Sequence, residues 1–141
     1  MNVLVIALDA AGPLDVRDAE VLVVAPAVNS RLRRWLSDDD EARRVAEERL
    51  AACVDRLERA GVHASGRVGD ADPVQAIADA LPTFAADEVV IAAHPVRSSG
   101  LGREVARRAR SRFGLPIVDA GERTAPNRLG SRGPETPSFP F

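Results

Sequence analysis

The sequence predicts an α/β fold, a three-layer, doubly wound, Rossmann-like parallel sheet of five strands in the order 3-2-1-4-5. Apolar runs such as Val3–Leu8 and Glu88–Ala93 lack the alternation of a half-exposed strand, which is typical of strands covered on both faces. Segments with helical spacing of apolar residues lie between these runs. Strands that alternate with helices through right-handed crossovers give a parallel sheet covered by helices on both sides.

Length and composition indicate one domain with a substantial core, because the chain has 141 residues. All 19 basic residues are Arg, which we interpret as the codon bias of a GC-rich genome, and the net charge is −2. This charge does not favour nucleic acid or a membrane surface. The single Cys53 excludes an intramolecular disulfide and a cysteine metal cluster. No apolar run approaches the roughly 20 residues that span a bilayer, and the chain enters its first strand without a basic leader, so we expect a cytoplasmic protein.

The expected strands cover 3–8, 21–25, 62–68, 88–93 and 115–120. Only about a dozen residues separate the first two strands, so we expect a shortened first crossover with a helix of a turn or two at most. Pro116 at the start of the last strand predicts an edge position. From Gly121 onward the chain is rich in Pro, Gly, Ser and Arg. We therefore divide it into a domain at 1–120 and a disordered tail at 121–141.

Three longer helices are expected between the strands. Ser37 is the expected N-cap of the first, and Gly61 is its expected left-handed C-cap. Asp72 and Pro73 open the second, since the carboxylate can accept the free amides of the first turn and proline lacks a donor that had no partner. The apolar line of the long helix includes Cys53, which we interpret as a buried, inert thiol. The buried line of the last helix is predicted to be Leu101, Val105, Ala109 and Phe113.

Three segments together resemble the universal stress protein family, of the adenine nucleotide alpha hydrolase-like superfamily. NVLVIALD (2–9) is similar to the family's first strand, VGDADPVQAIADAL (68–81) with ADEVVIAAH (86–94) to its Gly-x-Pro helix and following strand, and LPIVDA (115–120) to its closing strand. The resemblance covers about Asn2 to Ala120. It implies an adenine nucleotide such as ATP as the ligand, touched by Asp9, and a homodimer through the closing strand.

The sequence departs from the family pattern where nucleotide-binding members carry phosphate-binding glycines. Here the fourth strand ends in Ala92, Ala93 and His94, the loop to Gly100 is short, and Gly102 is followed by Arg103. This indicates a divergent member that lacks the usual glycine motif. We expect weak or absent ATP binding.

The expected ligand site lies where strands one and four diverge, because ligands of open α/β sheets bind at the carboxyl ends of the strands at that point. Asp9 and His94 should both enter this crevice. Ser98, Ser99 and Gly100 would supply free amides of a helix start, and Arg97 a positive charge. Asn29 opens a basic loop at 29–36 and completes the candidate set. The alternative is structural: a serine is only an N-cap, and His94 is a loop residue held by a backbone contact.

We carry three functional hypotheses from the sequence. The first is a non-enzymatic, universal-stress-like protein that binds a small ligand or a partner in the stress response. The second is a small hydrolase or nucleotide-acting enzyme that uses Asp9 and His94, although no nucleophile stands at recognisable spacing and no metal-ligand set is present. The third is an interaction module that dimerises through strand 115–120 and has no ligand. Arg residues crowd the last helix, but the acidic pI of the chain and the lack of balancing aromatic residues favour a solvated face over a nucleic-acid surface.

Overall fold

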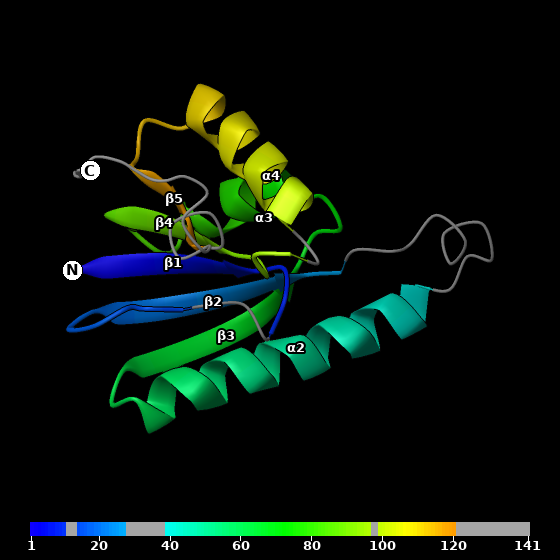
Figure 1. Ribbon diagram of the computed structural model, residues 1–141, viewed down its shortest axis with the longest axis vertical. Coiled ribbons are helices and arrows are strands. Elements are labelled where there is room, and N and C mark those ends of the chain that lie inside the picture. Colours follow the sequence, from blue (N-terminus) through cyan, green and yellow to red (C-terminus); the bar gives the residue numbers. More distant parts are fainter. Residues whose placement is uncertain (11–13, 28–38, 97–98, 121–141) are drawn as a thin grey trace, which may run out of the picture.

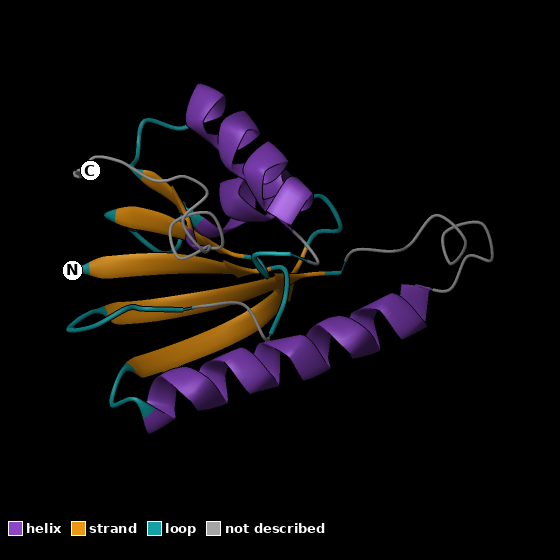
Figure 2. Cartoon of the chain, in the orientation of Figure 1, coloured by secondary structure: helices purple, strands orange, loops and turns teal. Residues whose placement is uncertain are grey.

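The computed structural model describes residues 1–10, 14–27, 39–96 and 99–120, which form one parallel five-stranded sheet (Figures 1 and 2). The strands are β1 (Asn2–Ala7), β2 (Glu20–Pro26), β3 (His63–Gly69), β4 (Glu88–Ala92) and β5 (Ile117–Asp119). Their order is β3-β2-β1-β4-β5 with every neighbouring pair parallel, which confirms the predicted fold class.

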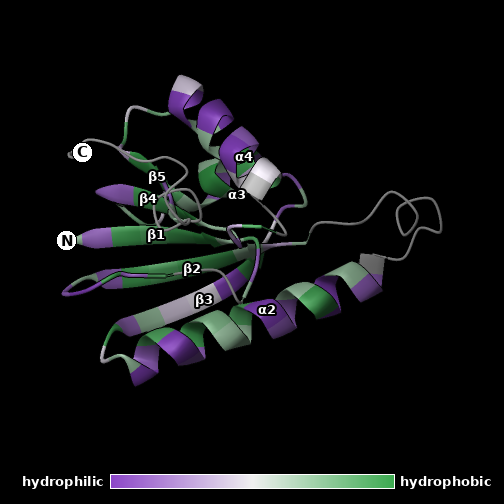
Figure 3. Cartoon of the chain, in the orientation of Figure 1, coloured by the Kyte–Doolittle hydropathy of each residue, from purple (hydrophilic) through white to green (hydrophobic). Residues whose placement is uncertain are grey.

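The helices cover the two faces of the sheet unequally. α2 (Asp39–Arg59) lies along one face over β2 and β3, and α3 (Pro73–Ala80) and α4 (Ser99–Arg112) lie on the other face (Figure 1). Two buried clusters result. One joins alternate residues of the central strands to Ala46, Cys53 and Leu57 of α2. The other joins the intervening residues to α3 and α4. Figure 3 shows β1 and β2 strongly hydrophobic and β3 paler, as expected for a central pair beside a more polar edge.

The first crossover is short, as predicted, and its described residues 8–10 and 14–19 form no helix. Leu14 and Val16 instead pack their side chains against the α2-side cluster. A cavity of about 560 Å³ opens between this segment and the C-terminal half of α2. None of the helices in the described ranges is long and apolar enough to cross a membrane.

The C-terminus of α2 confirms the predicted role of Gly61. Its φ is +84°, in the left-handed region that glycine adopts without a steric penalty. The Gly61 amide donates to the Glu58 carbonyl (3.0 Å), and the Val62 amide donates to the Leu57 carbonyl (2.9 Å). This pair of bonds is a Schellman motif. It turns the chain directly into β3. The N-cap predicted at Ser37 lies outside the described residues.

The buried line of α4 differs from the predicted one at its start. Val105 and Ala109 are buried, but Leu101 is 39% exposed, and Gly102 and Ala106 are buried in its place. The absent side chain of Gly102 is the reason. A Cβ there would lie 2.8 Å from the Ala93 Cβ, so the helix approaches the end of β4 through the glycine. Helical spacing alone favoured the larger apolar residue one position earlier.

The last strand has the predicted edge position but is shorter than predicted. β5 covers 117–119 and not 115–120, although the Pro116 carbonyl already accepts the Val89 amide (2.9 Å). Pro116 has no amide to donate, so the ladder begins after it. Homodimer formation through this strand stays a prediction. The domain boundary at 120 does too, since residues 121–141 lie outside the described ranges.

Candidate functional site

The carboxyl edge of the sheet brings the two main sequence candidates to adjacent strand ends. The amides of Leu8 and Asp9 both donate to the Ala92 carbonyl, at 3.0 and 3.1 Å. This shared acceptor holds the end of β1 against the end of β4. Asp9 and His94 are both half-buried there. The placement agrees with the predicted switch point, and the ligand role of the two side chains stays a prediction.

His94 is held by its own loop. Its Nδ1 accepts the Val96 amide at 3.0 Å, which closes the turn after β4. With Nδ1 acting as acceptor, the proton of the neutral ring lies on Nε2. This contact is the structural alternative weighed from the sequence. Among the described residues, no group of three or more His, Cys, Asp or Glu side chains could hold a metal ion.

Arg49 is a member of this edge that the sequence reasoning missed. It extends from α2 and its Nη1 donates to the carbonyls of Ala7 (3.2 Å) and Pro26 (2.9 Å), which joins the carboxyl ends of β1 and β2. Burial lowers the pKa of its guanidinium, and the charge of Asp9 acts in the opposite direction. A positive charge therefore lies beside Asp9. The sequence signal that could have identified Arg49 is its position on the border of the apolar stripe of α2.

A cavity of about 390 Å³ opens at the same edge, at the carboxyl ends of β2 and β3. This volume lies within the usual range for small-ligand sites. The lining comes from four elements and the turn after β3: Val24, Arg43, Arg67, Val68, Gly69, Asp70, Ala76 and Asp79. Two arginines and two aspartates thus line one hollow. The sequence reasoning did not select any of them.

Gly69 allows this hollow to form where β3 turns into α3. A Cβ on Gly69 would lie 2.6 Å from Val24 Cγ1 and 3.1 Å from the Ala76 Cβ, so only glycine lets α3 pack this closely. The Arg67 side chain is steadied by a bond from its Nη2 to Thr83 Oγ1 (3.2 Å). Asp70 is held in the turn, because its Oδ1 accepts the Asp72 amide (2.8 Å).

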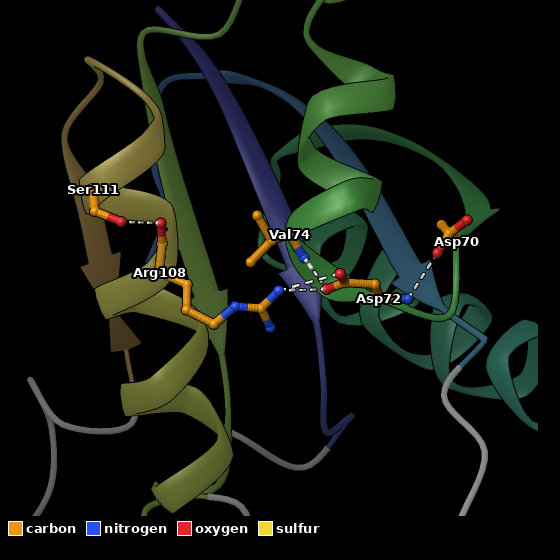
Figure 4. A network of polar contacts seen from close by, with 5 residues as sticks. All are labelled: Asp70, Asp72, Val74, Arg108 and Ser111. Atoms are coloured by element: carbon orange, nitrogen blue, oxygen red, sulfur yellow. Dashed lines mark hydrogen bonds and ion pairs between the residues drawn. The ribbon is translucent and has the colours of Figure 1, made fainter.

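Asp72 links this turn to α4, as Figure 4 shows. Its Oδ1 accepts the Val74 amide (3.0 Å), which confirms the predicted N-cap of α3, and Arg108 Nη2 donates to both carboxylate oxygens (3.3 and 3.2 Å). Partial burial raises the pKa of Asp72, but the Val74 amide and Arg108 outweigh it and hold the pKa below its ordinary value. The network fixes α3 against α4 and so supports the rim of the site.

The start of α4 lies at this edge as well, but the structure describes only part of the segment 97–100 that the sequence predicted to bind an anion. Asn29, Arg97 and Ser98 lie outside the described residues. Ser99 begins α4, and Gly100 is exposed. Apart from its chain neighbours and the backbone of its own helix, no described atom lies within 4 Å of where a Cβ would stand. The turn that follows packs inward, where Gly102 lies beside the buried Asp119 of β5.

No protein-family model and no curated protein matches this sequence. Among solved structures, the chain is similar to a universal stress protein family protein from Arabidopsis thaliana with AMP bound. The TM-score is 0.48 and the identity 15%, over 74% of this chain and 69% of that chain. The fold class of the chain is therefore assigned from its own sheet, as a parallel α/β protein with the strand order β3-β2-β1-β4-β5.

Proposed function

We propose that this chain is a non-enzymatic binding protein that takes a small anionic ligand at the carboxyl edge of its sheet, in the cavity at the ends of β2 and β3. The observation that carries the proposal is the lining of that cavity, where Arg43 and Arg67 share one hollow with Asp70 and Asp79. Guanidinium groups recognise phosphate or carboxylate, and carboxylates accept hydrogen bonds from hydroxyl or amino groups.

A nucleotide combines both chemistries, so it is the first ligand class to test. The sequence resemblance points the same way and adds a stress-response role and a cytoplasmic setting to the proposal. We expect weak binding, in the high micromolar to millimolar range, because the glycines that cradle phosphates in nucleotide-binding family members are missing from the sequence. Asp9 and Arg49 do not line the cavity; Arg49 reaches the carbonyls of Ala7 and Pro26 on the same edge of the sheet.

Thermal unfolding with ligand titration tests the proposal. A ligand at ten times its dissociation constant stabilises the fold by about 1.4 kcal/mol, which raises the melting temperature by several degrees. AMP, ATP, cyclic AMP and inorganic phosphate at ~10 mM form the panel. The double variant Arg43→Gln/Arg67→Gln should lose the shift. Arg44→Gln is the matched control, because Arg44 neighbours Arg43 in α2 but pairs with Glu41 and Glu48 outside the cavity.

Two results would reject this function. One is the absence of a shift with every compound at that concentration. The other is an equal shift in the double variant and in Arg44→Gln. An Asp9→Asn variant locates the ligand further, since a loss of binding there with the arginine pair intact would move the site toward the β1/β4 crevice.

A further inference from the structure

The two edges of the sheet differ in how open they are to another strand. An edge strand presents a row of unpaired amides and carbonyls, and native proteins blunt such edges with short strands or charged side chains. Here β5 ends the sheet on one side and β3 on the other. β5 has three residues and β3 has seven.

Arg110 occupies the β5 edge. The Pro116 carbonyl accepts the Val89 amide of β4, so the next carbonyl, that of Ile117, faces away from the sheet. Arg110 of α4 donates to that outward carbonyl through both Nε (3.2 Å) and Nη2 (2.9 Å). An incoming strand would have to displace this forked contact. The β5 edge is therefore short and partly satisfied by the chain itself.

In the part of the chain that the structure describes, no side chain bonds to the outward backbone groups of β3 as Arg110 does at β5. The Gly69 carbonyl accepts the Ala27 amide, so Gly69 faces β2, and the alternation of the strand turns the polar groups of Ala64, Gly66 and Val68 outward. No hydrogen bond to these outward groups occurs among the described residues. Their side chains are small and uncharged and point toward α2, where Leu50 and Val54 lie over Gly66.

We propose that β3 pairs with β3 of a second copy of this chain, antiparallel, across a two-fold axis at Gly66. This register pairs the outward-facing residues with each other, Gly66 with Gly66 and Ala64 with Val68, so every outward amide meets an outward carbonyl. The contact is self-complementary and closes as a dimer with a continuous ten-stranded sheet. The half-buried Leu50 and Val54, which flank the axis on the α2 side, would meet their counterparts there.

The same register makes a testable charge pattern on the opposite face of β3. Ser65 and Arg67 are exposed and point away from α2, and Ser65 of one copy lies directly opposite Arg67 of the other. Residues opposite each other in such a non-hydrogen-bonded pair approach most closely, and charged pairs there attract or repel measurably. The two-fold axis repeats the pair, so one substitution acts twice in the dimer.

Sedimentation velocity from 1 to 500 μM measures the dimer dissociation constant of the full chain and its variants. Ser65→Glu should tighten the dimer about 2- to 30-fold, because two Glu–Arg pairs form, and Ser65→Arg should weaken it by a similar factor. Ser111→Glu and Ser111→Arg are the matched controls, since they make the same charge changes on exposed α4 and should change nothing. Arg110→Ala removes the contact at the β5 edge and should also leave the dimer dissociation constant unchanged.

Three results would overturn the proposal. Wild type and Ser65→Glu could both remain monomers at 500 μM. The Ser65 and Ser111 variants could respond alike, which would show a net-charge effect and no specific pairing. A wild-type monomer could become a dimer in Arg110→Ala, which would make β5 the pairing edge and Arg110 its guard.

Discussion

Replacing Gly102 by Ala tests how closely α4 packs on the sheet. The new Cβ would lie 2.8 Å from the Cβ of Ala93 and 3.3 Å from Asp119 Oδ1, whereas carbon atoms in contact normally lie 3.5–4.0 Å apart. Ala93 is fully buried and its Cβ is bonded to the backbone, so it cannot swing aside. Overpacking of this kind costs about 1–3 kcal/mol. Alanine gains back roughly 1 kcal/mol over glycine in a helix. The difference leaves a net loss of up to about 2 kcal/mol in the free energy of unfolding.

Gly100→Ala provides the matched control. It lies two residues earlier in the same helix, and no described atom beyond its chain neighbours and its own helix backbone lies within 4 Å of its Cβ position. The substitution should therefore stabilise the protein by up to about 1 kcal/mol. Urea unfolding followed by circular dichroism separates the two variants. At roughly 3–6 °C per kcal/mol, their melting temperatures should also move in opposite directions.

A double variant then isolates the contact itself. Ala93→Gly removes the atom that the new methyl group meets, so Gly102→Ala/Ala93→Gly should be less destabilised than the sum of the two single changes, by about 1 kcal/mol or more. Gly102→Ala as stable as Gly100→Ala would refute the close approach. Strict additivity in the double variant would show that Ala93 is not what α4 meets.

Two further predictions follow from the described residues Asp72 and Cys53, and a third follows from the composition of the segment after Gly121. Asp72→Ala should cost about 1–2 kcal/mol of unfolding free energy, through loss of the α3 cap and the Arg108 contact. Because the pKa of Asp72 is lowered in the folded state, the contribution of its carboxylate is present above about pH 4 and lost on acidification. The difference in stability between wild type and Asp72→Asn should therefore close in urea melts towards pH 2, and a difference that persists there would contradict this origin. The Cys53 thiol, whose pKa is raised by burial, should resist a thiol reagent such as dithionitrobenzoate in the native protein and react at once in urea, and fast labelling of the folded protein would contradict its burial. A chain cut after Gly121 should keep its melting temperature within a degree or two, and a large drop would mean that the removed residues stabilise the domain.

The sequence by itself determined the layers and several element ends. The apolar runs at β1 and β4 lack alternation because both sheet faces are covered, and short right-handed crossovers leave few orders for five such strands. Asp72 and Gly61 were predictable because caps act within one turn, so their chemistry is written in adjacent residues.

Tertiary structure alone decided which side chains meet. The charged cavity takes Arg43 from α2, Arg67 from β3 and Asp79 from α3, and no spacing along the chain relates these three. The contact of Arg110 with the Ile117 carbonyl and the packing of α4 through Gly102 depend on how far a helix slides across the sheet. Periodicity reports which face of an element is buried. The position of the opposing surface is set by the fit of all the side chains between them, to within a methyl group, so it is decided only when the whole core is packed.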